Sequence, residues 1–460
     1  MPGNMDESPC NSHFGAVAEE IDETQSILRL NDDCLSSVLS HLSIMDLMIM
    51  EKVCLRFKSV VQMLYKTEHF ALRFDLLGEA DERDQNVFYT RQEIQDILCR
   101  VAPRINTVKA MYQALMSQDE DVECILTKCV NLENLYLHGM SGHSISKSTL
   151  KLFSKTFVNL RVAYLTNMNL NDDIMMECLL GATQLKTLNI SCNSSIRGKF
   201  LPELQNIQEI ELGFCKNIQA SYFTQFLSRN PGLKSLSLMR CSFINSSHLA
   251  AIANLQNLQS LAIHNWYRMH NPANIYLLGD LPCLRHLNIS FWHDFNIDPL
   301  LEKLAQRNTL ESLEIIRETS FEPEINIPTF FSRLKVIKFF KWCNLTDEML
   351  LNLPSKNTLQ ELHFQHCNII PVDGIIALIQ NCPELRLLSI YGLYKTNTNN
   401  LIKGILPILP ERLKPLEVVV NKELFSPPEI LSLVNNNPKL RMKYKIRLNP
   451  LWYSQITNIN

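Results

Sequence analysis

The segment Leu185–Asn193, LKTLNISCN, decides the fold because variants of it recur along the chain. Counted from Leu185, apolar residues occupy offsets zero, three and five, and Asn193 occupies offset eight. In an extended strand, Leu188 and Ile190 point to one face while the residues between them point to the other. One such strand cannot bury its apolar face alone, so the recurrence predicts a stack of copies.

Fourteen positions start a copy of this pattern, at steps of 22 to 28 residues. They are Ile105, Leu132, Leu160, Leu185, Ile207, Leu233, Leu258, Leu284, Leu310, Leu334, Leu359, Leu385, Leu413 and, more weakly, Leu440. Period and spacing are those of a leucine-rich repeat. We therefore predict an α/β solenoid, a leucine-rich-repeat horseshoe of about 13–14 repeats over residues 105–448, with strands on the inner curve and helices outside.

Offset eight carries a small polar residue in five copies, and helical patterns fill the intervals between strands. A polar side chain at this offset can satisfy backbone groups where the strand turns away. Segments 169–180 and 344–353 place Asp or Thr before an apolar periodic run, which predicts capped helices. The five offset-eight residues are Asn193, Cys215, Cys241, Cys367 and Asn421.

Composition excludes several classes of function. The chain has 460 residues, of which 46% are hydrophobic and 20% are charged, as in an ordinary globular protein. Its net charge of −3 gives no electrostatic reason to expect binding to nucleic acid or to an anionic membrane. The first ten residues lack the basic and apolar regions of a signal peptide, so we expect none, and no apolar run approaches the length of about 20 residues needed to cross a bilayer. Fourteen cysteines without a secretory signal indicate free thiols, and we expect the cytosol or the nucleus. Sequence motifs of enzymes and cofactor sites are absent.

Residues 1–26 contain six acidic residues and no lysine or arginine, so we expect a disordered tail; contact with a basic partner is the alternative.

From Leu28 to Phe74 apolar residues recur at helical spacing, which predicts short helices. Asn31, Asp32 and Asp33 offer a cap for a first helix, and Asp46 for a second. The apolar residues outnumber what two or three short helices can bury, which predicts a docking surface.

Residues 27–69 resemble an F-box in the order and spacing of their anchor residues, and Asp33, Asp46, Leu55 and Arg56 also fit the motif. Asn31 stands where that family has proline, and Phe57 where it has tryptophan. The resemblance implies docking on the Skp adaptor and, through it, on a cullin-RING ubiquitin ligase. The expected Skp-adaptor-binding residues are Leu30, Leu35, Val38, Leu39, Leu42, Leu47, Val53, Cys54, Phe57 and Val60.

Two segments flank the repeats. We interpret residues 70–104 as a linker and N-terminal cap, with a polar loop at 78–86 and a helix around Ile94–Val101 that Pro103 ends. At the other end, residues 439–448 alternate apolar and basic side chains, which predicts a charged edge strand that closes the sheet. A basic docking strip is the alternative for this strand, and residues 449–460 form a C-terminal tail.

Offsets two, four, six and seven of each strand line the predicted concave face. They are small or polar in early repeats, as at Thr187 and Glu211, and become aromatic or cationic from Leu258 onward. Aromatic and cationic residues on a solvent-facing surface are typical of a binding interface. We predict that this region holds a protein substrate through His264, Trp266, His286, Phe291, Lys338, Phe340, Lys341, His363, His366 and Tyr391.

Two alternatives to this concave interface concern its tryptophans and histidines. Trp266, Trp292 and Trp342 share offset eight, so they can instead fill the inner turn. His363, His366 and Cys367 suggest a metal, but offsets four and eight face different ways, so we expect no metal site. We also expect no cofactor.

Together these patterns predict a non-catalytic substrate adaptor of a Skp–cullin–F-box ligase. It would hold a protein for ubiquitination and proteasomal degradation. The alternative is a scaffold outside any ligase, whose F-box-like helices only cap the solenoid.

Overall fold

The computed structural model describes most of the chain. It covers residues 27–74, 91–111, 119–139, 152, 154–179, 181–264, 272–291, 296–317, 331–341, 346–353, 357–367, 371–390, 398–421 and 437–445. The predicted acidic tail (1–26), polar loop (78–86) and C-terminal tail (449–460) lie outside the described residues. So do Trp266, Trp292, Trp342 and Tyr391.

The chain divides into two compact units, Met1–Phe70 and Ala71–Asn460. In the first unit the described elements are helical, up to the strand that begins at Phe70. They are η2 (Ile27–Arg29), α1 (Asp32–Leu39), α2 (Ile44–Met50) and α3 (Leu55–Thr67). We call residues 27–69 the helical unit.

The second unit is built on one sheet whose 15 strands follow one another in chain order. Every pairing from β2 to β15 is parallel. The strands are β1 (Phe70–Phe74), β2 (Ile105–Met111), β3 (Asn134–His138), β4 (Val162–Thr166), β5 (Thr187–Asn189), β6 (Glu209–Glu211), β7 (Ser235–Leu238), β8 (Ser260–Ile263), β9 (His286–Phe291), β10 (Ser312–Arg317), β11 (Val336–Phe340), β12 (Glu361–Gln365), β13 (Leu387–Ser389), β14 (Leu416–Asn421) and β15 (Leu440–Lys445).

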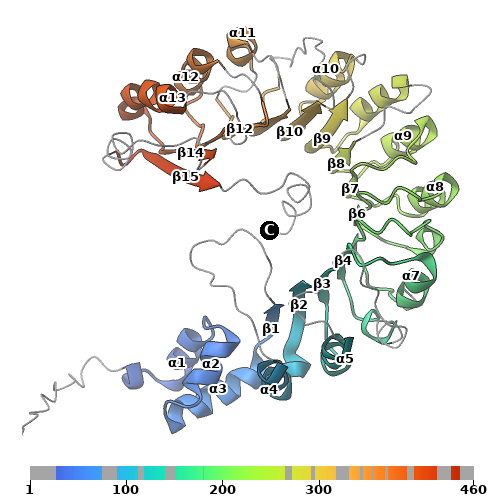
Figure 1. The fold of residues 1–460 in the computed structure, drawn as a ribbon, viewed down its shortest axis with the longest axis vertical. Helices are drawn as coiled ribbons and strands as arrows, with labels where there is room; N and C mark the ends of the chain where they lie inside the picture. The colour runs from blue at the N-terminus through green and yellow to red at the C-terminus, as the bar shows by residue number, and fades with distance from the viewer. Residues whose placement is uncertain are drawn as a thin grey trace, which may run out of the picture. The chain divides into compact units, whose positions relative to one another are not determined.

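Helices lie outside the strands in this repeat unit, as Figure 1 shows. They are α4 (Arg91–Val101), η3 (Ala102–Arg104), α5 (Asp119–Lys128), α7 (Asp172–Leu179), η4 (Leu201–Glu203), α8 (Ala220–Arg229), α9 (Ser246–Ala253), η6 (Pro272–Asp280), α10 (Asp298–Arg307), α11 (Asp347–Leu351), α12 (Val372–Asn381), α13 (Thr398–Ile405) and η7 (Leu406–Glu411). The shortest repeat step, from Leu185 to Ile207, contains only the three-residue 3₁₀ helix η4.

The repeat pattern occupies the interior as predicted. Leu185, Leu188 and Ile190 are each 1% exposed or less, while Thr187 is half-buried on the other face. From Leu132 to Leu385, each predicted start is followed two residues later by the first residue of a strand. The fold is a leucine-rich-repeat solenoid, the predicted horseshoe. The sheet also includes β1, a strand that the sequence analysis did not predict.

The predicted repeat starts at Leu413 and Leu440 are wrong. The register pairs Leu387 with Glu417 and Leu388 with Val418, which places Pro415 at offset zero. Leu413 is 91% exposed. In the last strand, Leu440 pairs with Leu416, so offset zero of that repeat lies at Lys439 and not at Leu440. Two frames overlap here, because a start at Leu413 and a start at Pro415 both place buried residues at offsets three and five: Leu416 and Val418 in the first frame, Val418 and Val420 in the second. Asn421 therefore does not occupy offset eight.

Six strands turn away from the sheet at offset seven through a left-handed residue. Asn167, Cys192, Phe214, Arg240, Lys341 and His366 share this offset and have φ between 54 and 64°. Where the next residue is Asn or Cys, its side chain satisfies the turn, as predicted. The Asn193 Oδ1 accepts from the Met168 and Leu170 amides, both at 3.0 Å. In the next two repeats, the thiols of Cys215 and Cys241 donate to backbone carbonyls at 3.2 and 3.0 Å.

Candidate functional site

The helical unit begins at Asn31, whose side chain caps α1. Its Oδ1 accepts from the Cys34 amide at 2.8 Å. The Asn31 φ is −67°, which is the value that proline imposes. Asparagine therefore keeps the backbone geometry that the family obtains from proline, and it adds a cap of its own.

The cap of α2 differs from the prediction, and α3 has a cap that the sequence analysis did not propose. Ser43, rather than Asp46, caps α2: its Oγ accepts from the Asp46 amide at 3.2 Å and donates to Asp46 Oδ2 at 2.7 Å. A break at residues 51–54 separates α2 from α3, where the sulfur of Cys54 accepts from the Phe57 amide at 3.4 Å. Hydrogen-bonding side chains thus define the start of all three helices.

The structure separates the predicted docking residues into core and surface. Leu35, Leu39, Leu47, Phe57 and Val60 are at most 4% exposed and hold the helices together. Leu30 and Cys54 are half-buried. Val38, Leu42 and Val53 are 45%, 36% and 59% exposed. Only the exposed residues present apolar area to a partner without unfolding the unit.

Sequence reasoning missed other exposed apolar residues of the helical unit. Ile49 is 59% exposed and Leu55 is 86% exposed, and Ile27, Leu28 and Met63 are each exposed by 40% or more. Apolar periodicity identifies the helices but does not separate core from docking face in so small a unit. We call Val38, Leu42, Ile49, Val53, Leu55 and Met63 the exposed apolar set.

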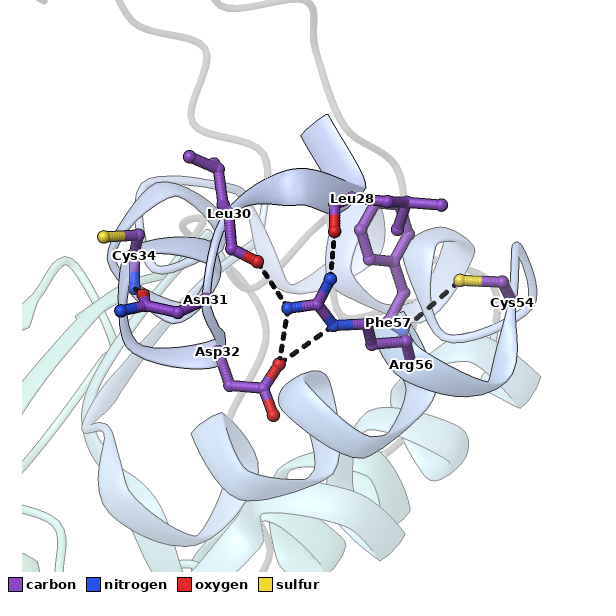
Figure 2. A network of polar contacts seen from close by, with 8 residues as sticks. All are labelled: Leu28, Leu30, Asn31, Asp32, Cys34, Cys54, Arg56 and Phe57. Carbon is purple, nitrogen blue, oxygen red and sulfur yellow. Dashed lines mark hydrogen bonds and ion pairs between the residues drawn. The ribbon is translucent and has the colours of Figure 1, made fainter. Parts of the chain in front are cut away.

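Arg56 connects the start of α3 to the segment before α1 (Figure 2). Its Nε donates to Asp32 Oδ1 at 2.9 Å, and the same carboxylate forms an ion pair with Nη2 at 2.9 Å. The Nη1 and Nη2 groups also donate to the carbonyls of Leu28 and Leu30. One guanidinium therefore holds three consecutive parts of the chain: η2, the residue after it and the first turn of α1.

Replacing Asn31 with proline is expected to change the stability of the helical unit by less than about 1 kcal/mol. Proline loses the cap, which contributes about 1 kcal/mol. It also restricts the unfolded chain at a compatible φ, which contributes about 0.4–1 kcal/mol. Asn31→Ala is the control, because it loses the cap without that gain. Amide hydrogen exchange of α1 measures both variants. A loss in Asn31→Pro larger than in Asn31→Ala would contradict the prediction.

On the repeat unit, parallel register aligns the predicted substrate-binding residues in rows. Lys338 pairs with His363 across β11 and β12, and Phe340 pairs with Gln365. The Phe340 ring lies 5.1 Å from the His366 ring, and the Lys341 Nζ lies 5.6 Å from the Phe340 centroid. These three side chains form one aromatic and cationic cluster.

The other predicted members of this surface differ in their placement. His286 is exposed at the start of β9, whereas Lys338 and His363 are half-buried. The Lys338 Nζ forms an ion pair with Glu314 Oε2 at 3.7 Å. The His363 Nε2 lies 3.4 Å from the Glu361 carboxylate. His363, together with Arg386, lowers the pKa of Glu361 to about 2. Phe291 belongs to β9, but its side chain lies outside the described residues, as do Trp266 and Tyr391.

The expectation that His264 faces solvent is wrong. It is 3% exposed, and its Nε2 donates to Asn288 Oδ1 at 2.7 Å. Offset six lies where the strand ends, so the following turn and the neighbouring strand can enclose a side chain there. Burial lowers the pKa of His264 to about 4.

The buried His264 is expected to make stability depend on pH. Between pH 6.5 and about 4, the unfolded chain binds a proton at this residue more readily than the folded chain. The free energy of unfolding therefore falls as the pH drops through this window, by at most about 1.4 kcal/mol per pH unit. His264→Gln keeps a donor for Asn288 and removes this component. Urea unfolding at several pH values tests it. The same dependence of the free energy of unfolding on pH in the wild type and in His264→Gln would refute the assignment of this effect to His264.

Sequence reasoning also missed an aromatic cluster on the early strands. Tyr136 and Tyr164 are paired across β3 and β4, and their ring centroids lie 4.8 Å apart. The Lys109 Nζ lies 4.6 Å from the Tyr136 ring. Both tyrosines stand at offset four, so the repeat register could have identified them. Their row continues through Asn189 to Glu211. The Asn189 Nδ2 donates a hydrogen bond to Glu211 Oε2 at 2.8 Å.

No metal centre is found among the residues that the structure describes. Within them, no three His, Cys, Asp or Glu side chains approach closely enough to hold a metal ion. The Cys367 thiol is fully buried and lies 3.7 Å from the Phe339 carbonyl, at offset eight of its repeat. Over the same described ranges, no helix is both long and apolar enough to cross a bilayer.

Comparison with known proteins identifies the helical unit. The family model described as the F-box domain matches residues 27–69. Residues 27–69 are an F-box. No curated protein matches the chain. The chain thus joins an F-box to a leucine-rich-repeat solenoid, a combination typical of non-catalytic protein-interaction adaptors.

Two solved structures resemble the chain at low identity. An internalin (inlF) from Listeria monocytogenes is 15% identical, with a TM-score of 0.38; the match covers 72% of this chain and 89% of the internalin. The Rad7 and Elc1 complex of yeast contains a chain that is 14% identical, with a TM-score of 0.47 and coverage of 90% and 91%. The assignment of the repeat fold therefore depends on the strands and burial described above.

Proposed function

We propose that this protein is the substrate-recognition adaptor of a Skp–cullin–F-box ubiquitin ligase. F-box domains bind Skp-type adaptors. The observation that carries the proposal is an F-box whose folded surface retains large apolar side chains, with Ile49 and Val53 each 59% exposed. Large apolar side chains that stay exposed in the folded unit can be buried by a partner, and their burial stabilises the complex.

The repeat unit supplies the second half of the proposed function. Its concave sheet face carries the Phe340–Lys341–His366 cluster and the tyrosine pair, which suit contact with a protein. The protein would form no bonds itself; it would raise the effective concentration of a substrate lysine near the transferring enzyme. Ubiquitination would then direct the substrate to the proteasome. We place this activity in the cytosol or the nucleus.

Reconstitution with purified partners tests the proposal. The full chain, co-expressed with a Skp-type adaptor, is expected to elute with it in one peak during size-exclusion chromatography. Addition of the cullin and its RING subunit should shift that peak to a larger complex. A wild-type chain that remains separate from the adaptor would reject the ligase role and favour the scaffold alternative. Substrates are then sought by capture on this complex, with a Phe340→Ala and Lys341→Ala variant as the matched control.

A further inference from the structure

The segment before α1 is a single exposed turn, η2. None of the three residues of η2 is buried. The bond from the Leu30 amide to the Ile27 carbonyl, 3.1 Å, closes its single turn. An isolated turn of this kind is not stable in water. Ile27 and Leu28 are nevertheless 43% and 44% exposed, so they present apolar area beside α1.

Arg56 occupies a position that a cation does not favour. It is the second residue of α3, where the helix dipole places partial positive charge. Its exposed ion pair with Asp32, with side chains 37% and 65% exposed, contributes little stability. The placement is explained by geometry, because the planar guanidinium reaches Asp32 and the carbonyls of Leu28 and Leu30 at once.

We propose that Arg56 is a positioning residue for adaptor docking, which holds residues 27–31 in the conformation that a Skp-type adaptor binds. This inference rests on the proposed function. Without the tether, fewer contacts hold the segment, so binding must order more of it, and that entropic cost reduces affinity. The docking surface would then include the apolar segment at Ile27 and Leu28 as well as the exposed apolar set.

Three substitutions in the full chain separate the tether from a simple charge effect. Arg56→Met removes every donor, Arg56→Lys keeps the charge but cannot span three acceptors, and Asp32→Asn keeps both carbonyl bonds. We expect adaptor affinity to fall about tenfold in Arg56→Met, less in Arg56→Lys and least in Asp32→Asn. Lys58→Met, which removes an exposed cation from the same helix, is the control and should bind as the wild type does.

Hydrogen exchange provides a readout that does not depend on the adaptor. In Arg56→Met, the Leu30 amide should lose protection while the amides of Val61 and Leu64 in α3 keep theirs. Unchanged protection at Leu30 would overturn the inference even if the adaptor binds. So would equal affinity of Arg56→Met and wild type, or full rescue by Arg56→Lys. Failure of the wild-type chain to bind any adaptor would instead reject the proposed function, a result distinct from the exchange measurement.

Discussion

Substitution of Ile49 and Val53 by aspartate is expected to abolish co-purification with a Skp-type adaptor while the F-box stays folded. Both side chains are 59% exposed, so neither holds the helices together. Burying one such side chain in an interface contributes about 1.5–3 kcal/mol. An aspartate in its place also has to lose water without a partner. For the pair, we expect affinity to fall by at least about 100-fold, which corresponds to about 3 kcal/mol.

The choice of positions decides whether this experiment is informative. Leu39 and Leu47 also belong to the predicted docking set, but each is 1% exposed. Leu39→Asp would therefore unfold the F-box, and lost binding would say nothing about the interface. Val130→Asp is a better control, because Val130 is 61% exposed but lies on the repeat unit. Size-exclusion chromatography with the adaptor measures binding, and circular dichroism measures folding. Binding retained by the folded Ile49→Asp and Val53→Asp variant would refute docking through this surface.

The repeat fold was predictable because one physical requirement recurs in every copy. Apolar residues at offsets zero, three and five have to be buried between strands and helices, and Leu233, Leu236 and Leu238 illustrate it with exposures of 1% or less. The prediction failed where two frames satisfy that requirement equally. Only the pairing with β13 decides between a start at Leu413 and a start at Pro415, and pairing is a long-range property.

The candidate sites were less predictable, because each depends on which neighbour covers a side chain. The helical spacing assigned both Val38 and Leu39 to the apolar face of one helix, yet Leu39 is buried in the core and Val38 is exposed. His264 has the offset of a solvent-facing residue, but its contact with Asn288 comes from the next repeat, 24 residues away. The Arg56 tether spans 24 to 28 residues and leaves no local pattern.

Replacing Asn193 with alanine is expected to destabilise the repeat unit by about 3–5 kcal/mol. The Asn193 side chain is fully buried. Its Oδ1 accepts from the Met168 and Leu170 amides, and its Nδ2 donates to the Leu165 and Ile190 carbonyls at 2.8 Å. Alanine removes all four bonds, and each buried backbone group left unsatisfied costs about 1–3 kcal/mol. The Ile190 carbonyl keeps the Cys215 thiol as a donor. The sum is limited because the turn can relax and admit water.

The neighbouring repeats supply a matched control for this prediction. Cys215 and Cys241 occupy the same offset, and each thiol donates to the offset-five carbonyl of the preceding repeat, that of Ile190 or Leu212. Asn193→Cys should therefore restore one donor to a carbonyl, but no strong acceptor for the Met168 and Leu170 amides. Its free energy of unfolding should lie between those of the wild type and Asn193→Ala. Urea unfolding followed by circular dichroism ranks the three proteins. Because stability in a repeat array is a sum over neighbouring units, the loss should be largest for amides of β4 and β5 in hydrogen exchange. Equal midpoints for Asn193→Ala and wild type would mean that the turn does not depend on this side chain.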